Sequence, residues 1–302
     1  MSHSLPVMAD DANFISIRLI ALRRIARYLR CNNTALFNLT LVCKRFNNKE
    51  EREILISNVD IFYLSSSSRM IHNKPPGWNK VYSMRVSEHI LSDFSALSGI
   101  RKLILEYCPQ LVDITPLRSI RDLTLHTCRR VRDVSPLSCV HKLYIYDLPL
   151  VTDVSALKDV YALKIYLCPG ITDVSALGTV HTLEIGHCLG VRDISALGTV
   201  HYLSLAYDNV VDYSALSTIH TIILFQSNIV NVSILRNAHE LRLIYCQNIT
   251  DISSLGALET LIVKYCQHID YCPIELDNVK NLFIASPNWH IITRGNFEGV
   301  VN

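Results

Sequence analysis

Six of the ten cysteines occupy one position of a repeated L-x-L-x-x-C phrase: Cys108, Cys128, Cys168, Cys188, Cys246 and Cys266. Regularly spaced thiols could bind a metal or form disulfides. However, the chain has no C-x-x-C motif, and Leu148 and Asp208 replace the cysteine in two units without a change of frame. We therefore expect free, buried cysteines in the turn after each strand, where a small side chain fits and its S–H donates weakly to the backbone.

Histidines form a second column immediately before the strands: His141, His181, His201, His220 and His239, the last four in consecutive units. Zinc binding is the alternative to a structural role, but zinc prefers tetrahedral geometry with ordered partners around its ligands. A flat column of imidazoles supplies this poorly. Other units place different side chains here, namely Arg101, Arg121, Tyr161, Glu259 and Lys280. The pattern predicts a structural or rim role, without a metal or another cofactor.

No catalytic motif accompanies these columns. The sequence contains no G-x-S-x-G, P-loop, H-E-x-x-H or glycine-rich dinucleotide motif. Asp and Ser recur together in unit after unit, whereas a catalytic group is needed only once. We therefore interpret them as scaffold residues and predict that the protein is not an enzyme.

The repeat itself is an Asp-apolar-Ser/Thr core that returns every 19 or 20 residues. Its first residues are Asp93, Asp113, Asp133, Asp153, Asp173, Asp193, Asp212, Asn231, Asp251 and, in a degenerate unit, Asp270. A period this constant is typical of a solenoid. Because each unit is short, it has no room for a full helix after a strand and two bends.

Each unit predicts a strand followed by a single turn of helix. Segments such as Leu103–Leu105 alternate in polarity, as in a strand with one buried face. The pairs Thr115-Pro116 and Ser135-Pro136 favour a helix N-cap with proline at the first helical position, and the preceding Asp favours a turn. The leucines that close these turns should point inward: Leu97, Leu117, Leu137, Leu157, Leu177 and Leu197.

The phrase L-x-L-x-x-C with D-[VI]-S-[AP]-L resembles the compact leucine-rich repeats of internalin-type proteins. The resemblance implies an α/β solenoid with a curved parallel sheet and short convex 3₁₀ or helical turns. It covers residues 81–302 in about eleven coils, the first at Val81–Ser87. Residues 1–13 are expected to be a flexible N-terminus, residues 14–50 a helical motif and residues 51–80 a connecting segment.

Residues 14–50 show apolar residues at helical spacing and resemble an F-box. The segment Leu41–Phe46 reads L-V-C-K-R-F, as the family commonly does, and Ile25–Leu29 matches its I-x-x-Y-L. The family's opening Leu-Pro is replaced by Ile17-Arg18. The resemblance implies binding to the Skp-type adaptor of a cullin ubiquitin ligase through Ile25, Leu29, Leu36, Leu39, Val42, Cys43 and Phe46. The alternative is a helical cap that covers the end of the solenoid core.

The concave face of a solenoid is its usual binding surface. Variable positions on it suggest a target-protein site made of Tyr144, Tyr146, Lys164, Tyr166, Glu184, Tyr202, Ile223, Phe225, Arg242, Ile244 and Lys264, with Ile262 beside them. The pairing of an F-box with leucine-rich repeats recurs in eukaryotes and in large DNA viruses. It implies a ubiquitin-ligase substrate receptor; the alternative is a plain binding module without a ubiquitin role.

Composition restricts the environment and the partners. The chain carries 29 Lys+Arg against 27 Asp+Glu, so bulk attraction to nucleic acid or anionic lipid is not indicated. No apolar run is long enough to span a bilayer. Asp10 and Asp11 precede an arginine-interrupted stretch, which argues against a secretory signal or a mitochondrial presequence. We expect a cytoplasmic or nuclear protein, in the host cytoplasm if the chain is viral, with no membrane or nucleic-acid partner.

Overall fold

The computed structural model describes residues 62–64, 83–87, 94, 97, 100–269, 273–286 and 289–295 of the 302-residue chain. These form one sheet in which the strands lie in sequence order. The strands are β1 (Phe62–Leu64), β2 (Ser83–Ser87), β3 (Lys102–Glu106), β4 (Asp122–His126), β5 (Lys142–Tyr146), β6 (Ala162–Tyr166), β7 (Thr182–Gly186), β8 (Tyr202–Ala206), β9 (Thr221–Phe225), β10 (Glu240–Ile244), β11 (Thr260–Lys264), β12 (Asn281–Ser286) and β13 (Trp289–Arg294).

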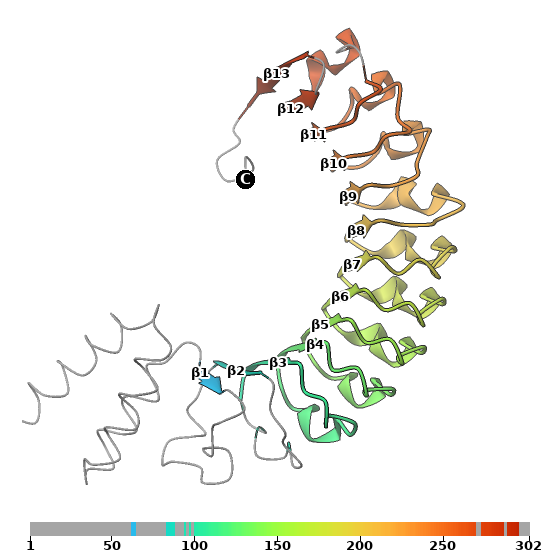
Figure 1. Cartoon of the computed structure of the whole chain (residues 1–302). Helices are drawn as coiled ribbons and strands as arrows, with labels where there is room; N and C mark the ends of the chain where they lie inside the picture. Colours follow the sequence, from blue (N-terminus) through green and yellow to red (C-terminus); the bar gives the residue numbers. More distant parts are fainter. Residues whose placement is uncertain are drawn as a thin grey trace, which may run out of the picture.

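The molecule is an arc with the strands on its inner side and short turns on its outer side (Figure 1). The outer turns are 3₁₀ helices: η5 (Thr115–Leu117), η6 (Ser135–Leu137), η7 (Ser155–Asp159), η8 (Ser175–Thr179), η9 (Ser195–Thr199), η10 (Ser214–Thr218), η11 (Ser233–Leu235), η12 (Ser253–Leu255) and η13 (Ile274–Asn278). The sequence predictions of a parallel sheet and short convex turns are confirmed, and the architecture is that of a leucine-rich-repeat solenoid.

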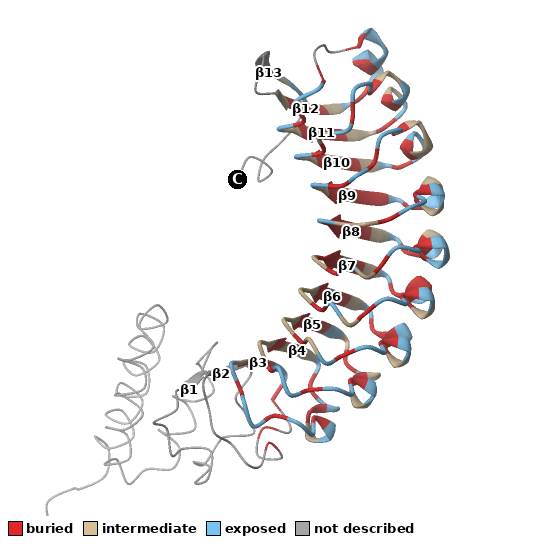
Figure 2. Ribbon diagram, turned by 45° about the vertical axis from the view of Figure 1, so that its right-hand side comes forward, coloured by how far each residue is buried: buried red, intermediate tan, exposed pale blue. Residues whose placement is uncertain are grey.

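Parallel pairing in strict register produces the core. Leu103, Leu123 and Leu143 are in register on β3, β4 and β5, and so are the next buried residues of these strands, Leu105, Leu125 and Ile145. All six closing leucines predicted to point inward are fully buried. The buried band runs along the arc between the sheet and the outer turns (Figure 2). Burying each leucine stabilises the fold by about 1.5–3 kcal/mol. Each coil therefore adds to the stability of the solenoid through its own buried leucines.

The turns before η5 to η10 and before η12 are held by an aspartate, and the turn before η11 by Asn231, rather than by a serine N-cap. Asp133 Oδ1 accepts a hydrogen bond of 2.8 Å from the backbone N–H of Ser135, and Asp153 does the same for Ser155. The N-cap position is apolar, for example Val134, and it makes no side-chain cap. The predicted serine N-cap is therefore wrong. An Asx turn satisfies the first backbone donor instead.

The residue after each of the strands β3 to β11 adopts a left-handed backbone, although none of these residues is glycine. Nine such residues, from Tyr107 to Tyr265, have φ between 48° and 57°. The conformation is retained because the N–H then reaches the next coil: that of Leu167 donates to the carbonyl oxygen of Gly186 at 3.0 Å. These bonds link successive coils beyond the ends of the strands.

Both ends of the sheet depart from the predicted repeat pattern. β1 lies within the segment expected to be a connector, and it pairs in parallel with β2. At the other end β13 pairs antiparallel with β12. Arg294 fastens β13 to the last turn, since its guanidinium donates to the backbone carbonyl oxygens of Leu276 and Asp277 at 3.0 and 2.7 Å. Neither strand was predicted from the repeat pattern.

Residues 14–50, with the F-box-like motif and its seven predicted adaptor-binding residues, lie outside the described part of the chain. Among the described residues, no helix has both the length and the apolar character that crossing a membrane requires.

Candidate interaction surface on the concave face

Three columns of side chains project from the concave face, from the first, third and fifth residues of each strand. The third and fifth residues supply all but one of the predicted target-binding side chains; Tyr202, a first residue, is the exception. All eleven are half-buried or exposed. Ile262 is the correction to the prediction: it lies between Arg242 and Phe283 in the third-residue column, and only 1% of its surface is exposed. Large neighbours on both sides cover it.

A hollow of about 490 Å³ opens over β3 to β7. Thr124 and Ala162 line the hollow, and they are small residues beside longer ones: Thr124 pairs with Tyr144 and Ala162 pairs with Lys142 in the strand register. Tyr144, Tyr166 and Lys164 also line it. A volume of this size is within the usual range of ligand pockets.

Tyrosines form the wall of this hollow. The Tyr144 ring meets the Tyr166 ring edge-on, with centroids 5.9 Å apart and an interplanar angle of 88°. The Tyr166 hydroxyl donates to Glu184 Oε2 at 3.2 Å, and Lys164 Nζ lies 2.8 Å from the other carboxylate oxygen of Glu184. Burial raises the pKa of both tyrosines, and the charge of Glu184 raises it further. Both hydroxyls therefore stay protonated and remain hydrogen-bond donors.

Positive charge gathers beside the hollow. Lys102 and Lys142 occupy the first position of β3 and β5, and Arg121 precedes β4; all three are exposed. No ion pair involves any of them within the described residues, whereas Asp122 is the one acidic group between the lysines. Its Oδ1 atom is buried and has no hydrogen-bond partner there.

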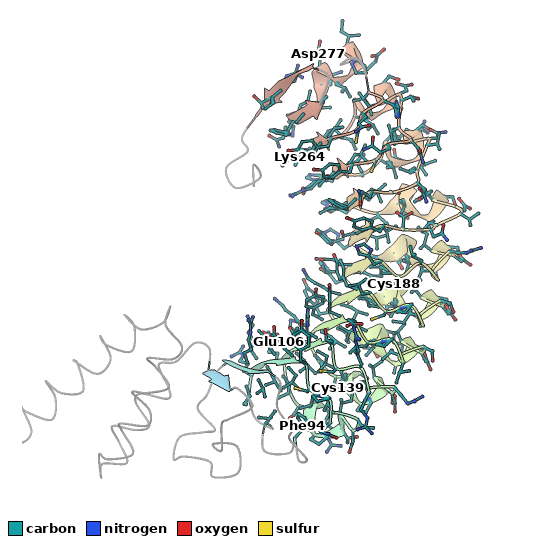
Figure 3. The ribbon with its side chains drawn as sticks, viewed as in Figure 1. Phe94, Glu106, Cys139, Cys188, Lys264 and Asp277 are labelled. Carbon is teal, nitrogen blue, oxygen red and sulfur yellow. The ribbon has the colours of Figure 1, made fainter. Side chains whose placement is uncertain are left out.

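The C-terminal half of the face is more apolar. Ile223, Phe225 and Ile244 are half-buried, and Arg242 is paired with Glu240 at 2.7 Å. Lys264 Nζ lies 5.1 Å from the centroid of the Phe283 ring. Glu106 on β3 and Lys264 on β11 are labelled on the inner side of the arc in Figure 3.

Apart from Phe225, sequence reasoning missed an aromatic edge at the C-terminal ends of the strands. It includes Tyr207, Phe225, Tyr245 and Tyr265, whose successive ring centroids are 5.3, 5.5 and 4.7 Å apart. Most members are the left-handed residues that follow the strands. The signal was present as repeated aromatic residues directly before the Cys position, but their direction depends on the backbone conformation.

The predicted histidine column is a continuous stack of rings on the opposite edge, which we call the His ladder. Neighbouring ring centroids lie 4.4 to 4.9 Å apart along the ladder. Its members are His141, Tyr161, His181, His201, His220 and His239. Desolvation, followed by the charges of His201 and His239, lowers the pKa of His220 below its ordinary 6.5. At the end of the ladder His239 Nε2 lies 2.7 Å from Glu259.

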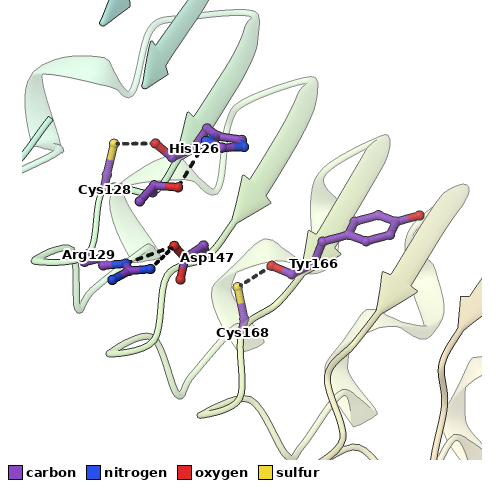
Figure 4. Close-up of polar contacts among 7 residues, drawn as sticks. His126, Cys128, Arg129, Asp147, Tyr166 and Cys168 are labelled. Atoms are coloured by element: carbon purple, nitrogen blue, oxygen red, sulfur yellow. Dashed lines mark hydrogen bonds and ion pairs between the residues drawn. The ribbon is translucent and has the colours of Figure 1, made fainter. Parts of the chain in front are cut away.

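The six repeated cysteines, which we call the Cys ladder, are buried as predicted. Cys168 Sγ lies 3.2 Å from the carbonyl oxygen of Tyr166, and Cys128 makes the same contact with His126 at 3.7 Å (Figure 4). Burial raises the pKa of the Cys168 thiol to about 12. Across the described residues no group of three His, Cys, Asp or Glu side chains is placed to hold a metal ion.

Comparison with known proteins found no matching family model and no matching curated protein. Among solved structures, the internalin InlF of Listeria monocytogenes is 18% identical over 78% of this chain and 75% of that chain, with a TM-score of 0.49. Internalin C2 of the same organism is 20% identical over 70% and 83%, with a TM-score of 0.38. A leucine-rich-repeat protein of Leptospira interrogans is 15% identical over 76% and 66%, with a TM-score of 0.39.

Proposed function

We propose that this protein is a protein-interaction scaffold that serves as the substrate-recognition subunit of a cullin-type ubiquitin ligase. In this proposal residues 14–50 bind a Skp-type adaptor and the concave face binds a target protein. The protein performs no chemistry itself, because ubiquitin transfer belongs to other subunits. Its place of action is the cytoplasm or nucleus.

The observation that carries the scaffold part is the concave face. It presents tyrosines, isoleucines and charged residues at fixed positions on a rigid parallel sheet. Such aromatic and charged residues dominate binding energy at protein interfaces. The ligase part is supported by the sequence Leu41–Phe46 and by Ile25–Leu29, which resemble an F-box.

A pull-down of the full chain with purified Skp-type adaptor tests the ligase part. Val42→Asp and Phe46→Asp place a charge in the proposed adaptor interface, so we expect both to abolish binding. Val211→Asp is the matched control, because Val211 is 78% exposed and far along the solenoid. Adaptor binding that is absent in the wild type, or unchanged in both variants, would refute the ligase role.

The alternative is a binding module whose N-terminal helices only cap the solenoid. The pairing of β1 with β2 supports this alternative, because the chain before the repeats already contributes a strand to the sheet. A cap predicts that Val42→Asp and Phe46→Asp lower the thermal midpoint of the solenoid while the adaptor fails to bind. A ligase motif predicts adaptor binding in the wild type and little change in that midpoint.

A further inference from the structure

We propose that the hollow over β3 to β7 binds an acidic segment of the target protein, with one large apolar or aromatic side chain inserted between acidic neighbours. This inference rests on the proposed use of the concave face for target binding and names the partner class. It concerns only the N-terminal half of that face.

The shape of the hollow is suited to one inserted side chain of the partner, which would act as an anchor. Its lining includes the small residues Thr124 and Ala162 together with the rings of Tyr144 and Tyr166. The edge-on packing of the two rings fixes both of them, so little side-chain entropy remains to be lost on binding. A buried anchor beside rigid tyrosines is the usual arrangement of an interface hot spot.

The positive charge around the hollow favours carboxylates on the partner, next to its inserted side chain. Lys102, Arg121 and Lys142 form no ion pair within the described part of the chain, whereas Lys164 is already paired with Glu184. Asp122 offsets only part of this charge. A partner with Asp or Glu on both sides of its anchor would therefore meet complementary charge, which raises association rates and selects the partner.

The ring arrangement favours a protein over a single-stranded nucleic acid. Base-binding surfaces need open aromatic faces. Here one face of the Tyr146 ring is covered by the stacked His126 ring, 4.3 Å away, and the Tyr144 ring is packed edge-on against two tyrosines. The carboxylates of Asp122 and Glu184 would also oppose a phosphate backbone.

Selection from a display library of random peptides of about twelve residues, long enough to cross several strands, tests the proposal on the full-length protein. We expect enrichment of sequences in which Phe, Trp, Tyr or Leu is flanked by Asp or Glu. Fluorescein-labelled copies of the enriched peptides should then bind less tightly as salt is raised, because the charged contacts are exposed.

Three variants locate the site. Lys142→Glu reverses a charge beside the hollow, and Ala162→Trp fills it; each should weaken peptide binding by about tenfold or more. Lys158→Glu is the matched control, because Lys158 lies on the convex η7 and the change in net charge is the same. We expect it to leave affinity unchanged. Circular dichroism checks that each variant is folded. If Ala162→Trp does not fold, Lys142→Glu still tests the site.

The proposal is overturned by neutral or basic enriched sequences, by no enrichment, or by affinity that is insensitive to Lys142→Glu. Tighter binding of a fluorescein-labelled oligothymidylate than of any peptide also overturns it. If the enriched peptides lose affinity for Ile244→Lys but not for Lys142→Glu, the proposal is also overturned. Target binding would then lie on the C-terminal half of the face, and the proposed function would stand. Adaptor pull-down with Lys142→Glu separates the two ideas, since this variant should retain adaptor binding.

Discussion

Two kinds of residue repeat without carrying chemistry. The nine left-handed residues after the strands tolerate an unfavourable backbone because their N–H groups bond to the next coil. The buried cysteines fill the turn behind them, with their sulfur atoms directed at backbone carbonyl oxygens. Both features follow from the same turn geometry, so they recur with it, and neither requires a ligand.

A first prediction concerns the left-handed position of Leu167, whose φ is 53°. Asparagine adopts this conformation at lower cost than leucine, so Leu167→Asn should raise the free energy of unfolding by up to about 1 kcal/mol. Urea unfolding followed by circular dichroism measures the change. The control is Leu189→Asn at a residue that lacks a positive φ and is 58% exposed. Equal effects of the two substitutions would show that the left-handed backbone is not strained.

A second prediction concerns thiol reactivity. Alkylation of the folded protein with iodoacetamide at pH 8, read out site by site by mass spectrometry, should modify Cys139 rapidly, because it is exposed. Cys168 and Cys188 should resist, because burial raises the pKa of both thiols. Denatured protein, in which all three should react, serves as the control. Modification of Cys168 as fast as Cys139 in the folded state would contradict the buried position of the Cys ladder.

At the scale of elements, the convex turns pack against one another through small residues and threonine bridges. Thr199 Oγ1 donates to the carbonyl oxygen of Gly178 at 2.6 Å, and Thr218 does the same to Gly198 at 2.7 Å. These bonds connect η8 with η9 and η9 with η10. They supply on the outer side the inter-coil contact that strand pairing supplies on the inner side.

Two glycines in the same repeat position give a matched test of this packing. A methyl group at Gly178 would overlap the backbone carbonyl oxygen of Ala196, whereas one at Gly198 would lie 3.1 Å from the Thr218 hydroxyl and 3.2 Å from the carbonyl oxygen of Ala215. Gly178→Ala should therefore destabilise the protein by about 1–3 kcal/mol, and Gly198→Ala by less. Thermal unfolding of both variants tests this order; the reverse order would contradict the convex packing.

At the scale of the whole molecule, we expect His220 in the His ladder to make stability sensitive to pH. The pKa of His220 is lowered by desolvation and then by His201 and His239; Glu240 and Glu259 act in the opposite direction. Because the unfolded chain takes up the proton more readily, the contribution of His220 is complete above about pH 6.5 and is lost as pH falls through its folded pKa. Stability should therefore fall on acidification.

Thermal midpoints measured between about pH 7.5 and 5.5 test this expectation. His220→Gln should reduce the loss of stability over that window, because it removes the proton uptake. His268→Gln is the matched control, at an exposed histidine that makes no ring contact with the ladder in the described structure. A pH profile that is equal in the wild type and His220→Gln would exclude a role for this residue.

The repeat period, the strands, the convex turns, the inward leucines and the buried cysteines were all readable from the chain. Each depends on local alternation or on the chemistry of one short phrase, and such signals need no knowledge of distant residues. The same alternation placed the eleven predicted target-binding side chains on the concave columns. Their binding role remains a prediction, as does adaptor binding by residues 14–50.

Other features required the assembled coils. The hollow exists because Ala162 and Thr124 lie beside longer side chains on neighbouring strands, and Ile262 is covered by residues of two other coils. The left-handed turns direct the aromatic edge, and β13 reverses the sheet direction at its end. Repetition fixes the face on which a side chain lies, but its exposure and charge balance depend on neighbours about twenty residues away, which only the stacked structure brings together.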